Sequence, residues 1–184
     1  MLNLRERILK AAKDSLAAKT AFLLFKKTET VKDHGINFHF HFYDRSTFEG
    51  AHPPRREKKD PLQPPFPTGI LAAHLTNSDG AHYLQINKFM FKEGHTIGSS
   101  DNPSAVQSDT LNDDDFRCFS TMMFEFGNKG IGYYNCGVQS GCSQFHKHIQ
   151  YIPHGDNPLA EHMSKGRSLP YLYYSKHIDW YSYE

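Results

Sequence analysis

Two stretches of the chain show the hydrophobic repeat of amphipathic helices. In residues 2–25, apolar side chains recur three and four residues apart, at Ile8, Ala11, Ala12, Leu16 and Phe22. Residues 109–126 repeat this spacing with Phe116, Phe119, Met123 and Phe126. Three aspartates stand in the expected first turn, where acids favour the helix dipole, and Gly127 provides a stop. The pattern predicts two helices that pack through their apolar stripes.

Short apolar runs between turn residues predict strands. Residues 70–75 and 82–86 are two such runs, and the Asp-Gly pair within residues 77–80 predicts a hairpin turn between them. Residues 131–135 predict another strand, which leads into the segment 132–154. The first two runs are therefore expected to lie side by side in one sheet.

Residues 36–43 alternate strictly between phenylalanine or other apolar side chains and polar ones. His39 and His41 share the polar face of this predicted strand. A His-x-His pair can bind zinc, but a zinc site needs further ligands, and no Cys-x-x-Cys or His-x-x-x-His partner lies nearby in the sequence. We interpret this face as the polar outer side of a strand.

The segment 132–154 carries the strongest candidate chemistry. In a strand, side chains alternate between faces, so that His146, His148 and Gln150 line one exposed side. The stretch 135–144 just before them is rich in small residues, which can bring backbone N–H groups close to an anion. A phosphate-binding loop followed by a row of imidazoles predicts a site that attacks phosphorus.

His148 is the candidate nucleophile, because a neutral imidazole attacks well near pH 7 without a separate base. Its second nitrogen should donate a hydrogen bond, to the carbonyl of His146 or of a neighbouring strand. His146 can orient this ring or contact a bridging oxygen, and Gln150 can donate to a non-bridging phosphoryl oxygen. Further donors to the developing charge are Asn135, Ser140, Gly141, Ser143 and Gln144. The alternatives are a polar strand face or half of a zinc site.

Two other places offer contacts to phosphate. Asn87 and Lys88 end an apolar strand, where they can reach a ligand at the sheet edge, although polar strand ends are also common surface features. The proline-rich, basic segment 52–68 is expected to be an extended loop. In it, Lys58 or Lys59 is a candidate phosphate contact, and a solvated connector is the alternative.

Length and composition limit the class of protein. The 184 residues suffice for one well-buried domain, which we place at 1–184. A hydrophobic fraction of 38% and an aromatic fraction of 14% suit a globular α+β protein. The 21 basic and 20 acidic residues leave a net charge of +1, which argues against nucleic acid or a membrane surface as a partner.

The same composition bears on location and assembly. No apolar stretch reaches the length of a membrane span, the start of the chain lacks the apolar region of a signal peptide, and three cysteines give no disulfide framework. We therefore expect a reducing compartment, the cytoplasm, with the nucleus as the alternative. Aromatic residues crowd positions 171–183, which indicates a surface for self-association or for further polypeptide.

The residues 135–137 (NCG) and 140–150 (SGCSQFHKHIQ) resemble the signature of diadenosine tetraphosphate phosphorylase, also called ATP adenylyltransferase. That family belongs to the histidine-triad superfamily and is related to galactose-1-phosphate uridylyltransferase. In these branches a glutamine, here Gln150, replaces the third histidine of the triad. The strand end at 86–89 and His95 also resemble family positions. The resemblance implies an α+β fold with a histidine-triad-like antiparallel sheet and flanking helices.

The resemblance also implies a reaction. Diadenosine tetraphosphate and phosphate would give ADP and ATP through an adenylyl group on His148, in two in-line displacements. It implies substrate-binding roles for Asn87, Lys88, Lys59 from the proline-rich loop, Asn135, Ser140, Gly141, Cys142, Ser143, Gln144 and Gln150. Cys142 stands where alanine or serine is usual. No covalent cofactor is implied, and a magnesium ion can accompany the substrate phosphates.

The family extends further at its C-terminus, so that we expect some substrate-binding residues to be absent from this chain. The expected partners are small nucleotides, namely diadenosine tetraphosphate, ATP and ADP, together with phosphate. Three other functions fit the residues. They are a histidine-triad hydrolase of dinucleoside polyphosphates, a catalytically idle nucleotide-binding protein, and a zinc-binding structural domain.

Overall fold

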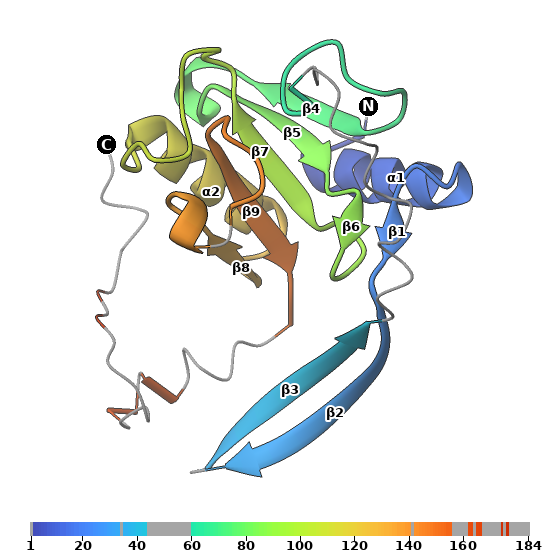
Figure 1. Cartoon of the computed structure of the whole chain (residues 1–184), viewed down its shortest axis with the longest axis vertical. Coiled ribbons are helices and arrows are strands. Elements are labelled where there is room, and N and C mark those ends of the chain that lie inside the picture. The colour runs from blue at the N-terminus through green and yellow to red at the C-terminus, as the bar shows by residue number, and fades with distance from the viewer. Residues whose placement is uncertain are drawn as a thin grey trace.

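The main body of the molecule is an antiparallel sheet packed against two helices, and a two-stranded hairpin projects from it (Figure 1). The computed structural model describes residues 2–33, 35–43, 60–140, 142–155, 162–163, 165–166, 174 and 176. Lys58, Lys59 and most of the aromatic C-terminal segment lie outside the described residues. Helices and antiparallel strands within one body confirm the α+β class predicted from the sequence.

Five strands form the main sheet in the order β4-β5-β7-β9-β8, and each neighbouring pair is antiparallel. The predicted hairpin is β4 with β5, and its connection contains the 3-10 helix η2 (Asn77–Asp79). The strand predicted at 131–135 is β8, with a slightly earlier start and end. The bounds are β4 Leu71–Leu75, β5 His82–Ile86, β7 Thr96–Ser100, β8 Gly130–Tyr133 and β9 His148–Pro153. Strand β9 begins at His148, so that His146 lies just outside it, and it is flanked by a neighbour on each side.

Both helices pack on the same face of this sheet. Helix α1 spans Leu4–Ala17 and α2 spans Asp113–Glu125, and each begins with a capping box, at Asn3 and at Asn112. Their buried side chains form one hydrophobic cluster with the inward side chains of the sheet. Neither helix is long and apolar enough to cross a membrane, and this holds for all the helices that the structure describes.

The first helix ends earlier than its hydrophobic pattern predicts. Its last residue is Ala17, and Lys19 follows with a left-handed backbone at φ 56°. The chain then forms β1 (Phe22–Leu23), which pairs in parallel with β6 (Phe89–Met90). Phe22 fits the helical spacing but lies in a strand, because pairing with β6 overrides the local pattern.

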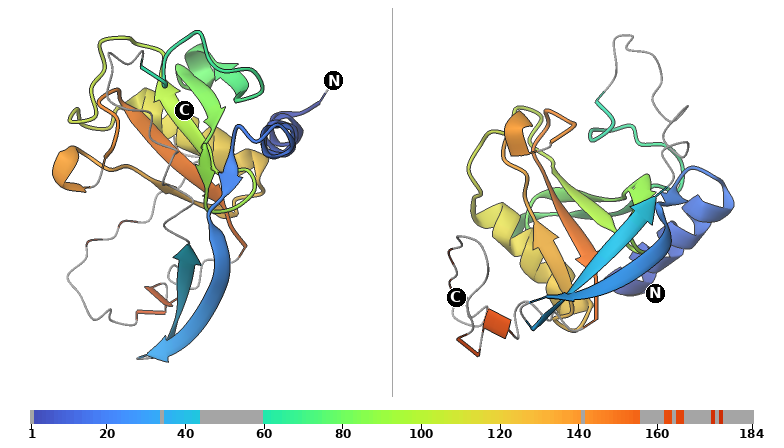
Figure 2. Two further views of the ribbon diagram at one scale, coloured as in Figure 1. Left: turned by 45° about the vertical axis from the view of Figure 1, so that its right-hand side comes forward. Right: turned by 60° about the horizontal axis from the view of Figure 1, so that its bottom comes forward.

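The hairpin of β2 (Phe25–Asp33) and β3 (Ile36–Tyr43) lies apart from the main sheet (Figures 1 and 2). The strand predicted at 36–43 is confirmed as β3, and in its register with β2 His39 lies opposite Thr30 and His41 opposite Thr28. The two imidazoles of β3 each lie 2.9 Å from a threonine hydroxyl of β2, in the pairs Thr28–His41 and Thr30–His39. The described part of the chain contains no group of three metal-binding side chains that could hold an ion.

Alternation along β9 separates the site from the core. Ile149 and Tyr151 are fully buried in the cluster beneath the helices. His148 and Gln150 therefore point to the opposite face of the sheet. Gly98 of β7 keeps the helix side compact, since a Cβ there would lie 3.0 Å from both Cys118 and Ile149.

We predict that Gly80→Ala destabilises the fold by about 2–5 kcal/mol, more than an ordinary glycine substitution in a turn. Gly80 has φ +86°, and a Cβ would lie 2.4 Å from the carbonyl oxygen of Asp114 and 2.7 Å from the amide of Cys118 in α2. Gly127→Ala is the matched control, because its φ is +66° and nothing lies within 4 Å. Urea unfolding measures both variants, and equal losses would contradict the close contact between this turn and α2.

Candidate active site

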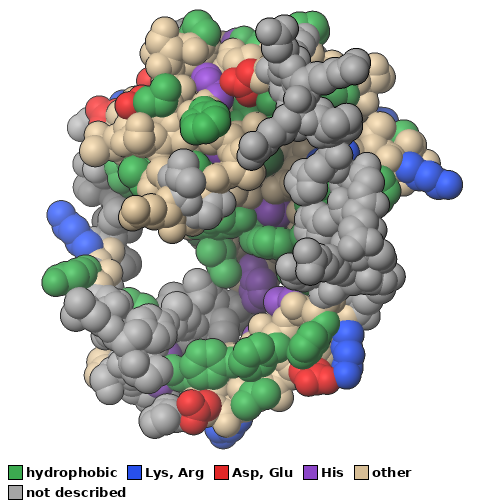
Figure 3. Space-filling view, in the orientation of Figure 1, with side chains coloured by type: hydrophobic (Ala, Val, Ile, Leu, Met, Phe, Trp, Pro, Cys, Tyr) green, Lys and Arg blue, Asp and Glu red, His purple; other side chains and the backbone are tan. Residues whose placement is uncertain are grey.

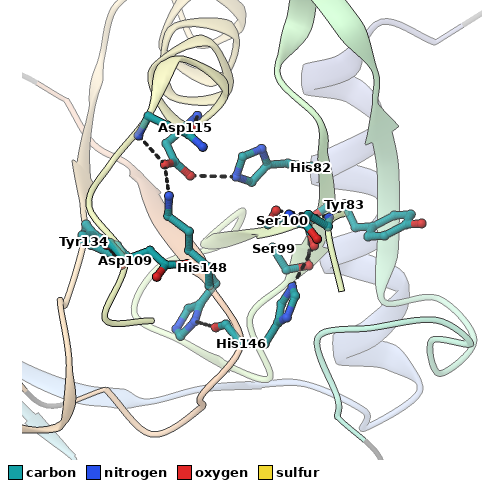
Figure 4. Close-up of polar contacts among 12 residues, drawn as sticks. His82, Tyr83, Ser99, Ser100, Asp109, Asp115, Tyr134, His146 and His148 are labelled. Atoms are coloured by element: carbon teal, nitrogen blue, oxygen red, sulfur yellow. Dashed lines mark hydrogen bonds and ion pairs between the residues drawn. The ribbon is translucent and has the colours of Figure 1, made fainter. Parts of the chain in front are cut away.

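His148 is the first residue of β9, and a backbone group two residues earlier orients its imidazole. Its Nδ1 lies 2.8 Å from the carbonyl oxygen of His146 (Figure 4). A carbonyl only accepts, so that Nδ1 carries the ring proton and Nε2 keeps a free lone pair. No other hydrogen bond to this ring occurs among the residues that the structure describes. The tautomer is the one that a nucleophilic Nε2 requires.

Burial also favours the neutral form of this imidazole. His148 is only 6% exposed, contrary to the exposed strand face that we expected. The segment that begins at Asp60 lies over the neighbouring part of the sheet, because the Leu62 carbonyl accepts a hydrogen bond from Ser99, the residue paired with His148 on β7. Burial lowers the pKa of His148 below its ordinary value of 6.5, and the hydrogen bond to His146 opposes this only in part.

His146 orients the imidazole of His148 through its backbone carbonyl, whereas its own ring turns toward β7. The Nε2 of His146 lies 2.8 Å from the carbonyl oxygen of Ser100, and its Nδ1 lies 3.7 Å from a carboxylate oxygen of Asp60. The ring is buried at 5% exposure. We expected His146 to orient the first imidazole, and the group that does so is its carbonyl.

Gln150 is held by three donors that meet at its side-chain oxygen. Its Oε1 lies 2.8 Å from the Tyr133 hydroxyl, 3.0 Å from Nε2 of His95 and 3.2 Å from Nδ2 of Asn87. The Asn87 amide is oriented in turn, because its oxygen accepts the N–H of Phe89 at 2.9 Å. With its oxygen occupied, Gln150 has its NH₂ group left to donate to a ligand.

His95 is a neutral donor to Gln150. Its Nδ1 accepts the N–H of Phe91 at 3.2 Å, so that the proton resides on Nε2, which faces Gln150. Burial lowers the pKa of His95 from 6.5 to about 4, although the hydrogen bond to Gln150 opposes the shift. The sequence alone assigned no role to Tyr133 and related His95 only to a family position. The pairing of Tyr133 with Gln150 across β8 and β9 brings these groups together.

An ion pair at Lys147 supports the chain next to His148 from the helix side. The Nζ of Lys147 lies 2.6 Å from one carboxylate oxygen of Asp115 and 2.8 Å from the Thr110 carbonyl, and the other carboxylate oxygen lies 3.1 Å from Nε2 of His82 (Figure 4). The three side chains are at most 4% exposed. Burial alone would raise the pKa of Asp115, but hydrogen bonds from His82 and Lys147 outweigh it and hold that pKa below 3.8. The pair ties the first turn of α2 to the peptide between the two histidines.

The predicted phosphate loop follows β8 and contains the 3-10 helix η3 (Val138–Ser140). Gly137 opens it at φ +80°, and the Ser140 hydroxyl donates to the Gly137 carbonyl at 2.8 Å. No side chain of this loop hydrogen-bonds to His148 in the part of the chain that is described, and Gly141 lies outside that part. The other predicted members are half-buried or exposed, namely Asn135, Cys142, Ser143 and Gln144.

Of the two predicted lysines, Lys88 lies within the described part of the chain. Lys88 is exposed next to Asn87, with its Nζ 5.5 Å from the centre of the Phe89 ring. Lys59 lies outside the described residues.

In the space-filling view, histidine and hydrophobic side chains face the hollow between the main body and the hairpin (Figure 3). Of the two predicted strand-end residues, Asn87 is the one that the structure brings into contact with Gln150.

The sheet order, the helices on one face and the imidazole beside a glutamine on the other define an α+β domain of the histidine-triad type. The family model described as the Ap4A phosphorylase N-terminal domain matches residues 2–166, and the chain belongs to that family. The family suspected from the residues around His148 is thereby confirmed.

Solved structures of yeast Ap4A phosphorylase Apa2 share the fold. The complex with AMP has a TM-score of 0.71 at 21% identity and covers 91% of this chain and 55% of that chain. The complex with Ap4A has a TM-score of 0.72 at 21% identity and covers 97% of this chain and 62% of that chain. This chain therefore spans between one half and two thirds of the length of these relatives. No match was found among curated proteins.

We predict that His95 makes folding stability depend on pH. Because its pKa is 6.5 unfolded and about 4 folded, the unfolded chain binds the extra proton between these values. The free energy of unfolding should therefore fall by about 3 kcal/mol as the pH drops from 6.5 to 4. Urea unfolding should show a flatter pH dependence for His95→Gln. The control is His74→Gln at an exposed histidine, which leaves His95 in place, and identical pH profiles for wild type and His95→Gln would refute the assignment.

We predict that Lys147 and Asp115 are energetically coupled. Lys147→Met leaves a carboxylate buried without its ammonium partner, which costs about 3–5 kcal/mol. The double variant Lys147→Met/Asp115→Asn should lose less than the sum of the single variants, with a coupling of about 1–3 kcal/mol in urea unfolding. The exposed pair Lys10–Asp14, with side chains 63% and 53% exposed, is the control and should couple by less than about 0.5 kcal/mol. Additive losses at Lys147 and Asp115 would argue against the ion pair.

Proposed function

We propose that this domain transfers AMP from diadenosine tetraphosphate to phosphate, with His148 as the nucleophile and ADP and ATP as products. The observation that carries the proposal is the hydrogen bond from Nδ1 of His148 to the His146 carbonyl, which leaves Nε2 free to attack. Membership of the Ap4A phosphorylase family supports the choice of substrate. The Apa2 structures with AMP and with Ap4A show that a relative of this fold binds such nucleotides.

The first displacement forms the covalent intermediate. The Nε2 of His148 attacks the phosphorus next to one adenosine, the bond from that phosphorus to the bridging oxygen breaks, and ATP leaves. Nδ1 keeps its proton, so that the ring becomes a positively charged adenylyl-imidazole. The His146 carbonyl lies 2.8 Å from Nδ1 and stabilises this charge, because the hydrogen bond strengthens when the donor becomes cationic.

The second displacement regenerates the enzyme. An oxygen of inorganic phosphate attacks the same phosphorus, the phosphorus–nitrogen bond breaks, and ADP leaves with the ring again neutral. The NH₂ group of Gln150 donates to a non-bridging oxygen in both steps, since its carbonyl oxygen is already occupied. As a neutral donor it does not lose or gain a proton during the cycle.

Other members of the site extend the proposal. Asn87, Lys88 and Lys59, and the loop residues Asn135, Ser140, Gly141, Cys142, Ser143 and Gln144, bind the phosphates and ribose. A magnesium ion would enter with the substrate phosphates and not through a carboxylate cluster. The three free cysteines suit a reducing compartment such as the cytoplasm. Self-association through the aromatic C-terminal segment remains part of the proposal, and Tyr174 in it is 93% exposed.

We predict that His148→Ala abolishes turnover of diadenosine tetraphosphate and the acid-labile mass gain of one AMP on the intact chain. Because the side chain is buried, His148→Asn is a second variant that keeps an amide donor near the His146 carbonyl, and circular dichroism checks the fold. Gln150→Ala should slow the reaction less. The matched control is His74→Ala, an exposed histidine outside the site, which should keep wild-type turnover.

The products decide between the alternatives. Formation of ADP only when phosphate is added supports phosphorolysis, whereas AMP formed without phosphate indicates the hydrolase. Nucleotide binding without any adenylate on the wild-type chain indicates the idle binding protein. Unchanged turnover in a folded His148→Ala variant would defeat the mechanism.

A further inference from the structure

A buried glutamine outside every strand and helix contacts the nucleophile's backbone. Gln107 lies between β7 and α2, and it is 2% exposed. Its side-chain oxygen accepts the N–H of His148 at 2.7 Å, and its NH₂ group donates to the His148 carbonyl at 3.0 Å. The same NH₂ group donates to the Asn135 carbonyl at 3.0 Å. Both backbone polar groups of the nucleophile thus bond to one side chain.

These contacts replace the strand pairing that β8 does not extend as far as His148. On one side of β9, Ser99 of β7 is paired with His148. On the other side β8 stops at Tyr133, opposite Gln150, so that no β8 residue pairs with His148. Buried backbone groups without partners are costly, and the Gln107 amide supplies the donor and the acceptor that a peptide unit would have supplied.

The backbone of Gln107 holds the start of the phosphate loop at the same time. Its carbonyl accepts the N–H of Gly137 at 3.1 Å and the hydroxyl of Tyr134 at 2.8 Å. Its own N–H donates to the Phe145 carbonyl at 2.7 Å. A single residue therefore joins both ends of the loop between β8 and β9 to the backbone of His148.

We propose that Gln107 is a positioning residue that sets the distance and direction from the His148 ring to the phosphate-binding loop. The inference rests on the proposed function, because positioning matters only if phosphorus must meet Nε2. A nucleophile displaced by about 1 Å can lose on the order of 10²-fold in rate, even when the substrate is still bound. Gln107 does not touch the reacting atoms, so its loss should reduce kcat and leave KM nearly unchanged.

The experiment compares two buried glutamines, one that contacts the backbone of His148 and one that does not. Gln107→Met keeps the length of the side chain and removes every side-chain hydrogen bond, and Gln107→Asn keeps the amide but withdraws it from His148 by one methylene. Gln85→Met is the matched control, because Gln85 is 3% exposed and donates to Ser99 and Leu62 without touching His148. Readouts are kcat and KM with diadenosine tetraphosphate, the melting temperature, and ¹⁵N NMR of the His148 ring.

We expect both methionine variants to lose a similar amount of thermal stability. Only Gln107→Met should reduce kcat by roughly 10- to 100-fold, with KM within about threefold of wild type and a mixture of ring tautomers at His148. Gln107→Asn should have a kcat between those of wild type and Gln107→Met, and it replaces Gln107→Met if that variant does not fold. Equal effects of Gln107→Met and Gln85→Met on kcat and on the tautomer would overturn the inference.

The proposed function can fail separately. If the wild-type chain forms no adenylate, the proposed reaction is refuted, and the NMR measurement still tests the positioning role of Gln107. The ring reports the position of His148, because the Nδ1 bond depends on the distance to the His146 carbonyl. A single His148 tautomer in wild type that becomes mixed in Gln107→Met supports the positioning role, whereas ring ¹⁵N shifts that are identical in wild type and Gln107→Met overturn it.

Discussion

The site depends on one peptide group, the unit between His146 and Lys147. Its carbonyl accepts Nδ1–H of His148 at 2.8 Å, and its N–H donates to the Ala105 carbonyl at 3.1 Å. Because the peptide is planar, fixing the N–H on one side also fixes the direction of the carbonyl on the other. The tautomer of His148 is therefore set by backbone geometry, and the side chain of Lys147 secures that geometry through its buried bond to Asp115.

The alternation of β9 explains how such a site can lie on a small domain. Side chains at odd positions, Ile149 and Tyr151, fill the core, and Lys147 reaches α2 on the same side. His148 and Gln150 face away from the helices, so that the reactive groups and the packing groups do not compete for space. A shift of the strand by one residue would exchange the two sets, and the buried ion pair opposes such a shift because Lys147 would lose Asp115.

Hydrophobic spacing and turn residues in the sequence were enough to predict the individual helices, strands and hairpin whose formation depends on neighbouring residues. The hairpin of β4 and β5, the strand β3 and the helix that begins with the three aspartates all follow from spacing and turn residues. Phe22 shows the limit, because pairing of β1 with β6 places it in a strand against its helical spacing. The same limit applies to the site. The His146 carbonyl lies two residues from His148, so that its contact with the His148 ring could be predicted from the sequence. Gln107 and His95 approach through strand pairing and loop closure, which leave no signal in the spacing of residues.

The neutral character of the site follows from these distant contacts. Tyr133, His95 and Asn87 direct three hydrogen bonds at the oxygen of Gln150, and burial lowers the pKa of His95 to about 4 and raises that of Tyr133 to about 12. None of these groups changes charge near neutral pH. A histidine in place of Gln150 could titrate and could turn either nitrogen toward the ligand, whereas an amide with its oxygen occupied presents only donors. The network thus converts a flexible amide into a fixed hydrogen-bond donor beside an imidazole that is also kept neutral, and this electrostatic setting suits the proposed attack of an uncharged imidazole on an anionic phosphate.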